Sequence, residues 1–294
     1  MHLFTTAEAA EYLRLKERKL YELVAEGAIP CTKVTGKWLF PKAELDRWLS
    51  GSLTRPDGMT PSEAMPIVGG SHDPLLEWSL RESASGLATL PEGSEAGLRR
   101  FIRGELVAAA IHLHAFDDET LDANVDMMRN EPNLHDAVLV AFVRREVGLL
   151  VPPGNPQGLS GLKDVSKMSA RMAVRPNGAG AQLLLEALLR RAGLAPDRMN
   201  FINPPSPTGP DVAQSIRVGR ADCGIAIRAV ANAAGLDFVP IVWERFDLVI
   251  RQRYYFRPQL QTLMHFLASD ALAARAAEFG GYDLTGTGRV RFAQ

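Results

Sequence analysis

One stretch of the chain constrains its folding most. Residues 50–66, SGSLTRPDGMTPSEAMP, are rich in Ser, Pro, Gly and Thr and carry no apolar periodicity, which is typical of a linker. The 294-residue length is also better matched by two compact bodies than by one. We therefore predict a small domain over residues 1–50, a linker over 51–66 and a larger domain over 67–294.

Charge and cysteine content exclude several classes of protein. The formal net charge is −1, so the chain does not coat nucleic acid by bulk charge and any DNA contact must be local. Cys31 and Cys223 fall in different predicted domains, so we expect no disulfide framework and no cysteine-based zinc site. The N-terminus lacks a basic segment followed by an apolar one, and no apolar run is long enough to span a bilayer. These features predict a cytoplasmic protein without membrane contact.

Residues 1–50 have the pattern of three short helices and one hairpin. A helix capped by Thr5 or Thr6 precedes a three-residue turn, and a second helix is predicted over residues 16–26. A hairpin is predicted over residues 32–40. Two short helices joined by a tight turn, with the second helix basic at its start, form the geometry that enters the major groove.

The third helix is predicted to start at Pro41 and to pack Leu45, Trp48 and Leu49 against the core. The exposed face of the second helix and the hairpin would then contact DNA. The candidate contacts are Lys16, Arg18, Lys19, Tyr21, Lys33 and Lys37. The alternative is that these charges form only a solvated face.

Several motifs carry a resemblance to a known family. They are T-x-x-E-A-A-x-Y-L at residues 5–13, E-G-x-I-P at 26–30, G-K-W at 36–38 and D-x-W-L at 46–49. This segment resembles the excisionase-type winged helix-turn-helix family, related to the MerR DNA-binding head, and the resemblance implies binding to double-stranded DNA. The family usually has Ser or Thr where this chain has Lys16 and Arg where it has Lys33, so base preference is not predicted.

After the linker, short apolar runs alternate with amphipathic segments, which is typical of an α/β domain with mainly parallel sheet. Three loops that follow apolar runs offer hydroxyls or small residues at the start of a helix: residues 69–74, 91–94 and 175–180. Ligands bind beyond the carboxyl ends of the strands in such folds, so the three loops together indicate an anion site.

The larger domain also resembles a known family. The motifs that carry this resemblance are G-G-S-H-D-P at 69–74, E-G-S-E-A-G-L at 92–98, A-A-A-I-H-L-H at 108–114, the segment at 148–165 that would cross between two lobes, R-P-N-G-A-G-A-Q at 175–182 and G-R-A-D-C-G-I-A-I at 219–227. They are similar to the type II periplasmic-binding-protein-like domain, in its molybdate- and tungstate-binding-like branch.

The resemblance implies two lobes joined by two crossings, near residues 150–157 and 242–249. Lobe one would comprise residues 67–150 and 243–294, and lobe two residues 151–242. The ligand would be bound by Ser71 and Ser94 from lobe one and by Asn177, Gly178, Ala179 and Gly180 from lobe two, with Arg175 and His114 as additional candidates.

The sequence shows no complete set of metal ligands and no known catalytic motif. His112 and His114 point the same way on a strand, but no third ligand lies at motif spacing, so we expect no protein-ligated metal ion and no cofactor. The chain has no G-x-S-x-G motif, no phosphate-loop lysine and no Cys-His constellation, so we expect no enzyme. Molybdate or tungstate would be bound as an effector.

The two domains together predict a transcriptional regulator that senses a small anion, molybdate or tungstate in the first instance. A single small head buries too little surface for tight specific binding, so we expect a homodimer or higher oligomer on a pseudo-palindromic site. Two alternatives remain open: a regulator of an organic small molecule, and a non-regulatory protein that handles molybdenum or a pterin. An excisionase-type architectural factor is disfavoured because the larger domain would lack a purpose.

Overall fold

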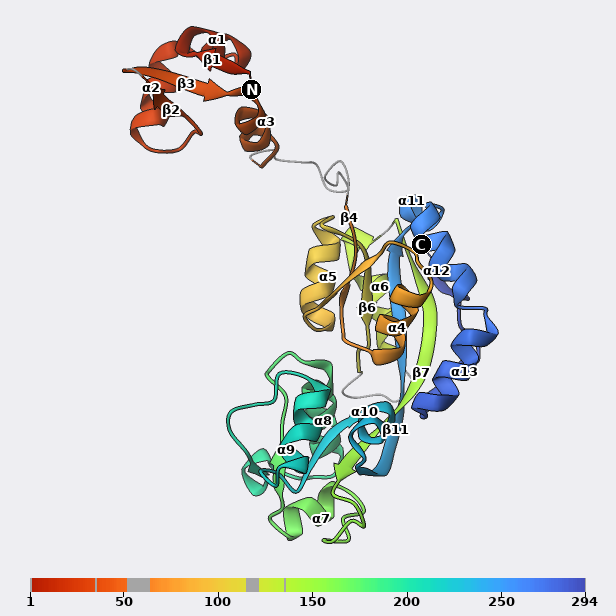
Figure 1. The fold of residues 1–294 in the computed structure, drawn as a ribbon. Coiled ribbons are helices and arrows are strands. Elements are labelled where there is room, and N and C mark those ends of the chain that lie inside the picture. Colours follow the sequence, from red (N-terminus) through yellow and green to blue (C-terminus); the bar gives the residue numbers. More distant parts are fainter. Residues whose placement is uncertain (1, 35, 52–63, 115–121, 135, 294) are drawn as a thin grey trace. The chain divides into compact units, whose positions relative to one another are not determined.

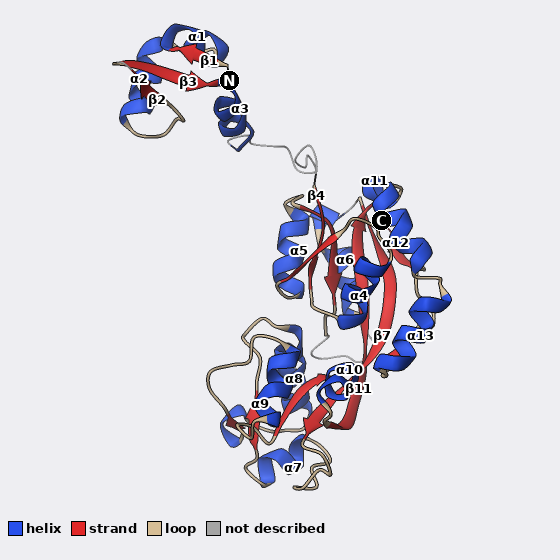
Figure 2. Cartoon of the chain, in the orientation of Figure 1, coloured by secondary structure: helices blue, strands red, loops and turns tan. Residues whose placement is uncertain are grey.

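The computed structural model describes residues 2–34, 36–51, 64–114, 122–134 and 136–293. Figures 1 and 2 show the helices and strands over these ranges. The chain divides into two compact units, Met1–Met59 and Thr60–Gln294. Thr35, inside the predicted hairpin, and most of the predicted linker lie outside the described residues.

The first unit is a small winged helix-turn-helix. Its elements are β1 (Leu3–Thr5), α1 (Thr6–Tyr12), α2 (Glu17–Ala25), β2 (Thr32–Val34), β3 (Lys37–Pro41) and α3 (Lys42–Gly51). The strands form an antiparallel sheet in the order β1-β3-β2. The Thr5 side chain and Glu8 form a capping box that starts α1.

The core of this unit is built from residues of every helix and of the wing, among them Ala9, Leu20, Phe40 and Leu45. Three details differ from the sequence expectation. Pro41 ends β3, and α3 begins at Lys42 rather than at Pro41. β1 was not anticipated, because its three residues are too few to show an alternating pattern. Leu49 is exposed rather than packed in the core, whereas its neighbour Trp48 packs against the core and donates from Nε1 to Ala28 O at 2.8 Å.

The second unit is an α/β domain built on one mixed sheet in the order β5-β4-β6-β11-β7-β10-β8-β9, with β12 and β13 also paired to β7. The strands are β4 (Met65–Gly70), β5 (Ala88–Pro91), β6 (Leu106–Ile111), β7 (Ala137–Val151), β8 (Arg171–Ala173), β9 (Asn200–Phe201), β10 (Cys223–Ile227), β11 (Asp237–Arg251), β12 (Tyr282–Asp283) and β13 (Val290–Ala293). The strands β5-β4-β6 are parallel to one another, as are β10-β8-β9. The antiparallel pairs are those that involve β7 or β11.

Helices flank both parts of this sheet (Figures 1 and 2). They are α4 (Pro74–Glu82), α5 (Ser94–Ile102), α6 (Ala123–Asn130), α7 (Leu162–Lys167), α8 (Gly180–Arg191), α9 (Gly209–Arg217), α10 (Arg228–Ala234), α11 (Gln252–Tyr255), α12 (Pro258–Phe266) and α13 (Asp270–Phe279). Among the described residues, no helix is both long enough and apolar enough to cross a membrane.

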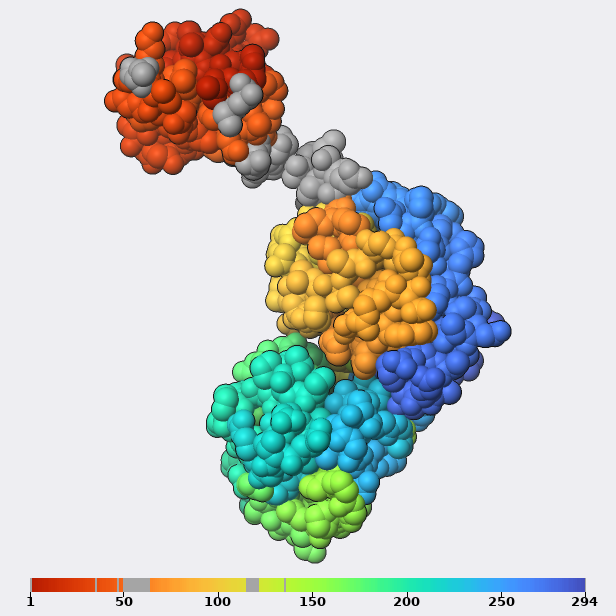
Figure 3. All heavy atoms as spheres, in the orientation of Figure 1, coloured from red at the N-terminus to blue at the C-terminus, as the bar shows by residue number. Residues whose placement is uncertain are grey.

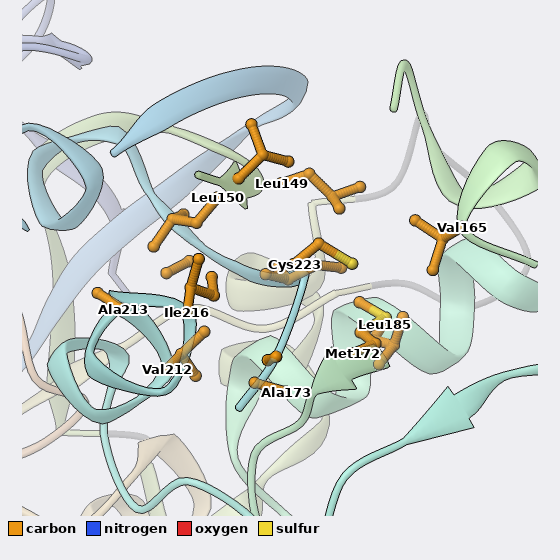
Figure 4. Packing of buried hydrophobic residues seen from close by; sticks show 14 of the residues in the cluster. Leu149, Leu150, Val165, Met172, Ala173, Leu185, Val212, Ala213, Ile216 and Cys223 are labelled. Atoms are coloured by element: carbon orange, nitrogen blue, oxygen red, sulfur yellow. The ribbon is translucent and has the colours of Figure 1, made fainter. Parts of the chain in front are cut away.

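The apolar residues of this unit gather around two separate regions, which define two lobes. The first lobe has cores around Phe142 and Phe246 and around Phe101 and Ile111. The second lobe has one core, in which β8, β10 and the helices α8 and α9 pack together. Figure 4 shows part of it, with Cys223 between Leu149 and Met172.

Two long strands, β7 and β11, pass from one lobe to the other. β7 contributes Val143 to the first-lobe core and Val147 to the second-lobe core, so it changes lobes at residues 144–146. This crossing comes earlier than the predicted segment 150–157. The charged triplet Arg144, Arg145 and Glu146 continues the strand instead of ending it, because β11 pairs with this part of β7 throughout.

Candidate functional site

A cleft of about 360 Å³ lies between the two lobes. In Figure 3 the first lobe, orange and yellow, meets the second lobe, teal, along an indented line. The first lobe lines the cleft with Ser71 and the residues that start α5, and the second lobe lines it with residues 175–181 and Thr208. Residues of the crossing strands, Arg145 and Glu244, also line it.

Two helices begin at this cleft without a capping side chain. The N-cap of α5 is Gly93 and that of α8 is Ala179, and neither makes a side-chain hydrogen bond to the helix. The first backbone N–H groups of a helix have no partner inside it and favour negative charge. Gly93 and Gly178 have φ values of +92° and +81°, which glycine adopts without strain and which bring the backbone to the cleft wall.

Arg175 supplies a positive charge to the same cleft. Its Nη2 donates to Pro207 O at 2.7 Å, while its Nε is buried and has no hydrogen-bond partner. No carboxylate oxygen within the described ranges forms an ion pair with it. Burial lowers the pKa of Arg175 below its ordinary value, although a guanidinium stays charged at neutral pH. Arg175 can therefore pair with an incoming anion.

The two predicted serines lie at different depths. Ser71 lines the cleft, and its Oγ is hydrogen-bonded to Ser94 Oγ at 2.8 Å. Ser94 does not itself line the cleft, and its Oγ accepts a hydrogen bond from His112 N at 3.1 Å. Ser94 thus lies behind Ser71 and holds it in place.

A buried charged group forms the base of the cleft. Arg145 Nε lies 2.5 Å from Glu244 Oε1, and Arg145 Nη1 lies 3.0 Å from Asp73 Oδ2. Asp73 also caps α4 and accepts from Tyr282 Oη at 3.1 Å. Burial alone would raise the pKa of Glu244, but Arg145 and then the neighbouring histidines lower it below its ordinary value. The Glu244 carboxylate is therefore ionised at neutral pH.

Sequence reasoning missed Arg145 and Glu244. The available signal is a charged residue beside a long apolar run on each of two segments, and taken alone such a residue indicates the end of a strand. Charged side chains inside a strand are buried only where they find partners, so the two segments have to be considered together.

Of the other predicted ligand contacts, Asn177, Gly178, Ala179 and Gly180 line the cleft together with Arg175. His114 does not line it, and its Nε2 lies 3.0 Å from Glu244 Oε2. His112 is buried at the cleft wall, and burial lowers its pKa to about 3, so its imidazole is neutral at physiological pH.

The candidate DNA contacts are all on the surface of the first unit. Lys16 is the N-cap of α2, and Arg18 and Lys19 lie near Glu22 at 3.4 and 3.2 Å. Tyr21 is 50% exposed. Lys37 is exposed at the start of β3, whereas Lys33 Nζ lies over the Trp38 ring, 5.2 Å from its centroid.

The comparisons with known proteins agree with this architecture. The model of the PBP superfamily domain matches residues 77–268. The chain belongs to this family. The model of a helix-turn-helix domain matches residues 3–52, so the predicted combination of an excisionase-type head with a periplasmic-binding-protein-like domain is confirmed.

Two relatives are uncharacterised proteins. The YvgK protein of Bacillus subtilis (strain 168) is 23% identical over 98% of this chain and 97% of its own length. A protein of Clostridium pasteurianum, encoded in the 5′ region of a 2Fe-2S ferredoxin gene, is 28% identical over 37% of this chain and 96% of its own length. The first relative therefore shares the full two-domain extent of this chain.

Solved structures share the fold at low identity. The C206S mutant of OxyR from Corynebacterium glutamicum, bound to H2O2, has a TM-score of 0.51 and 12% identity, and the match covers 93% of this chain and 91% of that one. The tungstate ABC transporter protein of Geobacter sulfurreducens has a TM-score of 0.51 and 10% identity over 75% of this chain and all of that one. The predicted two-lobed α/β fold is confirmed.

A DNA-binding head and a solute-binding domain together fit a DNA-binding regulator with a ligand-binding domain. Neither domain is of an enzymatic type. The Cys223 thiol is buried, and burial raises its pKa to about 12, so it is not a reactive thiolate at neutral pH.

Proposed function

We propose that this chain is a ligand-responsive transcriptional regulator whose head binds DNA and whose cleft binds a small anion, with molybdate and tungstate as the first candidates. The observation that carries the proposal is Arg175, a guanidinium at the cleft with no carboxylate partner among the described residues. A protein keeps such a group where an anion completes its hydrogen bonds.

The backbone around Arg175 supports the same ligand class. The uncapped starts of α5 and α8 come from opposite lobes, so an anion between them receives N–H groups from both sides. Ser71 adds a hydroxyl from the first lobe. Fixed dipoles of this kind replace the hydration shell of an oxyanion, and binding then favours lobe closure.

An organic anion is the second candidate, and the size of the cleft favours it. A volume of about 360 Å³ falls within the range of small-molecule sites, and it exceeds what four oxygen atoms need. Ile225, Ile227 and Val230 of the second lobe add an apolar wall that a metal oxyanion does not use. A ligand with one anionic group and an apolar body would occupy both parts.

Calorimetry of ligand-stripped full-length protein tests the ligand class. The titrants are molybdate and tungstate, with sulfate and phosphate as controls. Binding of the first two alone at micromolar affinity supports the metal-oxyanion regulator. No heat with any of the four contradicts that assignment, and organic anions are then screened by thermal shift.

DNA binding is tested with genomic fragments that are selected on immobilised protein. Fluorescence anisotropy then measures the affinity of the protein for these fragments with and without the ligand. A regulator changes its affinity for the selected DNA when ligand is added. Equal affinity in both states contradicts the regulatory proposal. We also propose a homodimer or higher oligomer, which light scattering of the eluted protein checks directly.

A further inference from the structure

The sheet brings a third metal-ligating residue to the two histidines. β6 and β11 are antiparallel, with Ile111 opposite Asp247. Three residues further along the same register, His114 comes opposite Glu244. The contacts agree with this register, because His112 stacks on Phe246 at 5.9 Å and His114 Nε2 lies 3.0 Å from Glu244 Oε2.

The three side chains form a compact donor set. One ligand atom from each of His112, His114 and Glu244 lies within 4.8 Å of the others. A tetrahedral shell with bonds of about 2.1 Å places its ligand atoms roughly 3.4 Å apart, so the widest pair has to approach by at most about 1.4 Å to complete the site. His114 Nε2 is buried and lies 3.0 Å from Glu244 Oε2, so two of the three donor atoms already face each other.

The surroundings suit a coordinating carboxylate. Arg145 binds Glu244 Oε1, which leaves Oε2 free to face the histidines. Ligating carboxylates in metal sites are themselves hydrogen-bonded in this way. Ser94 Oγ lies 3.4 Å from His112 Nδ1, and this contact orients the ring of a proposed ligand.

We propose that His112, His114 and Glu244 bind a divalent transition-metal cation of the Zn²⁺ class, with an open coordination position toward the cleft. Two imidazoles and one carboxylate are ligands that Zn²⁺ and its neighbours in the series prefer. His112 and Glu244 line the cleft, so an anion bound there can complete the coordination shell.

The test is Zn²⁺ binding to chelator-treated full-length protein, measured by competition with a chromophoric chelator. Co²⁺ serves as a spectroscopic probe, because its visible absorption reports nitrogen and oxygen ligands in a low-coordinate site. We expect one ion per chain, and we expect His114→Gln and Glu244→Gln each to weaken binding at least about tenfold. His265→Gln is the control, because His265 is exposed on α12 away from the cluster.

Glu244→Gln also removes the partner of Arg145 and can unfold the domain, whereas His114→Gln leaves that ion pair intact. Thermal melts of both variants identify a folding defect. Zn²⁺ binding that is absent from the wild type, or that is equal in wild type and His114→Gln, overturns the proposal. The titration uses no anion and no DNA, so its outcome is independent of the regulatory function proposed above.

Discussion

Gly180 at the start of α8 lies directly against the imidazole of His112, so the two lobes touch at this point. A Cβ at residue 180 would overlap the ring at Nε2. The backbone of Gly180 is not in the left-handed region, so conformation does not require glycine there. The close approach of the lobes requires it.

Gly180→Ala is therefore expected to hold the lobes apart while leaving each lobe folded. Ligand affinity should fall at least about tenfold, because closure brings the donors of both lobes to the ligand. Small-angle scattering and calorimetry measure the two effects. Gly161→Ala is the matched control, because a Cβ there meets no atom within 4 Å. Equal ligand affinity in Gly180→Ala and wild type would show that closure does not bring these residues together.

Ser71→Ala should weaken anion binding by about 1 to 3 kcal/mol, since it removes a hydroxyl at the cleft wall. Ser94→Ala should have a smaller effect, because Ser94 acts through its hydrogen bond to Ser71. Calorimetry of both variants gives the comparison, with Ser83→Ala, outside the cleft, as control. A larger loss in Ser94→Ala than in Ser71→Ala would contradict this order. DNA binding without ligand should be unchanged in all three.

Arg175→Gln should lower anion affinity about 10- to 100-fold, because a charge-assisted hydrogen bond contributes roughly twice as much as a neutral one. Arg171→Gln provides the control, since Arg171 pairs with Asp222 outside the cleft. Anion titrations at two salt concentrations should also show a weaker salt dependence in Arg175→Gln. Unchanged affinity in this variant would remove the main support for an anionic ligand.

For the head, Lys16→Ala and Lys37→Ala should each reduce the slope of log affinity against log salt by about 1, as expected for the loss of one phosphate contact. Both lysines are exposed, Lys16 at the start of α2 and Lys37 at the start of the second wing strand. Anisotropy titrations on selected DNA measure the slope, and Lys163→Ala in α7 is the control. A slope equal to that of the wild type would mean that the residue is only a solvated charge.

Asp247 predicts a pH effect on stability. It is buried on β11, accepts from Asn124 Nδ2 at 2.7 Å and pairs with Arg291. Burial raises its pKa to about 6, above the ordinary value of 3.8, so the folded state binds the proton more tightly than the unfolded state. Its contribution is therefore fully present below pH 3.8 and is lost as pH rises through 6.

Relative to Asp247→Asn, the wild type should gain about 2 kcal/mol in free energy of unfolding between pH 7.5 and pH 4.5. Urea titrations of both proteins across this range measure the difference. The comparison cancels titrations elsewhere, because both proteins share every other ionisable group. A difference that stays constant with pH would mean that Asp247 titrates at its ordinary value.

Local sequence patterns were sufficient to predict most of the helices and strands. The run Cys223–Ile227 is short, apolar and follows a turn, a pattern that predicts a buried strand, and β10 has these bounds. The loop at residues 175–180 was predicted to start a helix at the cleft, because small residues after an apolar run have that geometry. Both predictions depend only on neighbours in the chain.

The long strands and the base of the cleft were not predictable in the same way. β7 and β11 continue through charged residues that, taken alone, indicate the end of a strand. Arg145 is tolerated there because Glu244, 99 residues away, and Asp73, 72 residues away, neutralise it. The same long-range register places Glu244 beside His112 and His114, which local spacing left with an incomplete set of ligands.

The sequence by itself determined the two domains, their fold classes, and the loops that face the cleft, because apolar periodicity and turn residues act over a few neighbouring positions. Only the tertiary structure decided which charges are paired and which are free. Arg145 and Arg175 look alike in the sequence, but one is neutralised inside the fold and the other is left at the cleft. Electrostatic pairing depends on distance in space, and register between distant strands sets that distance.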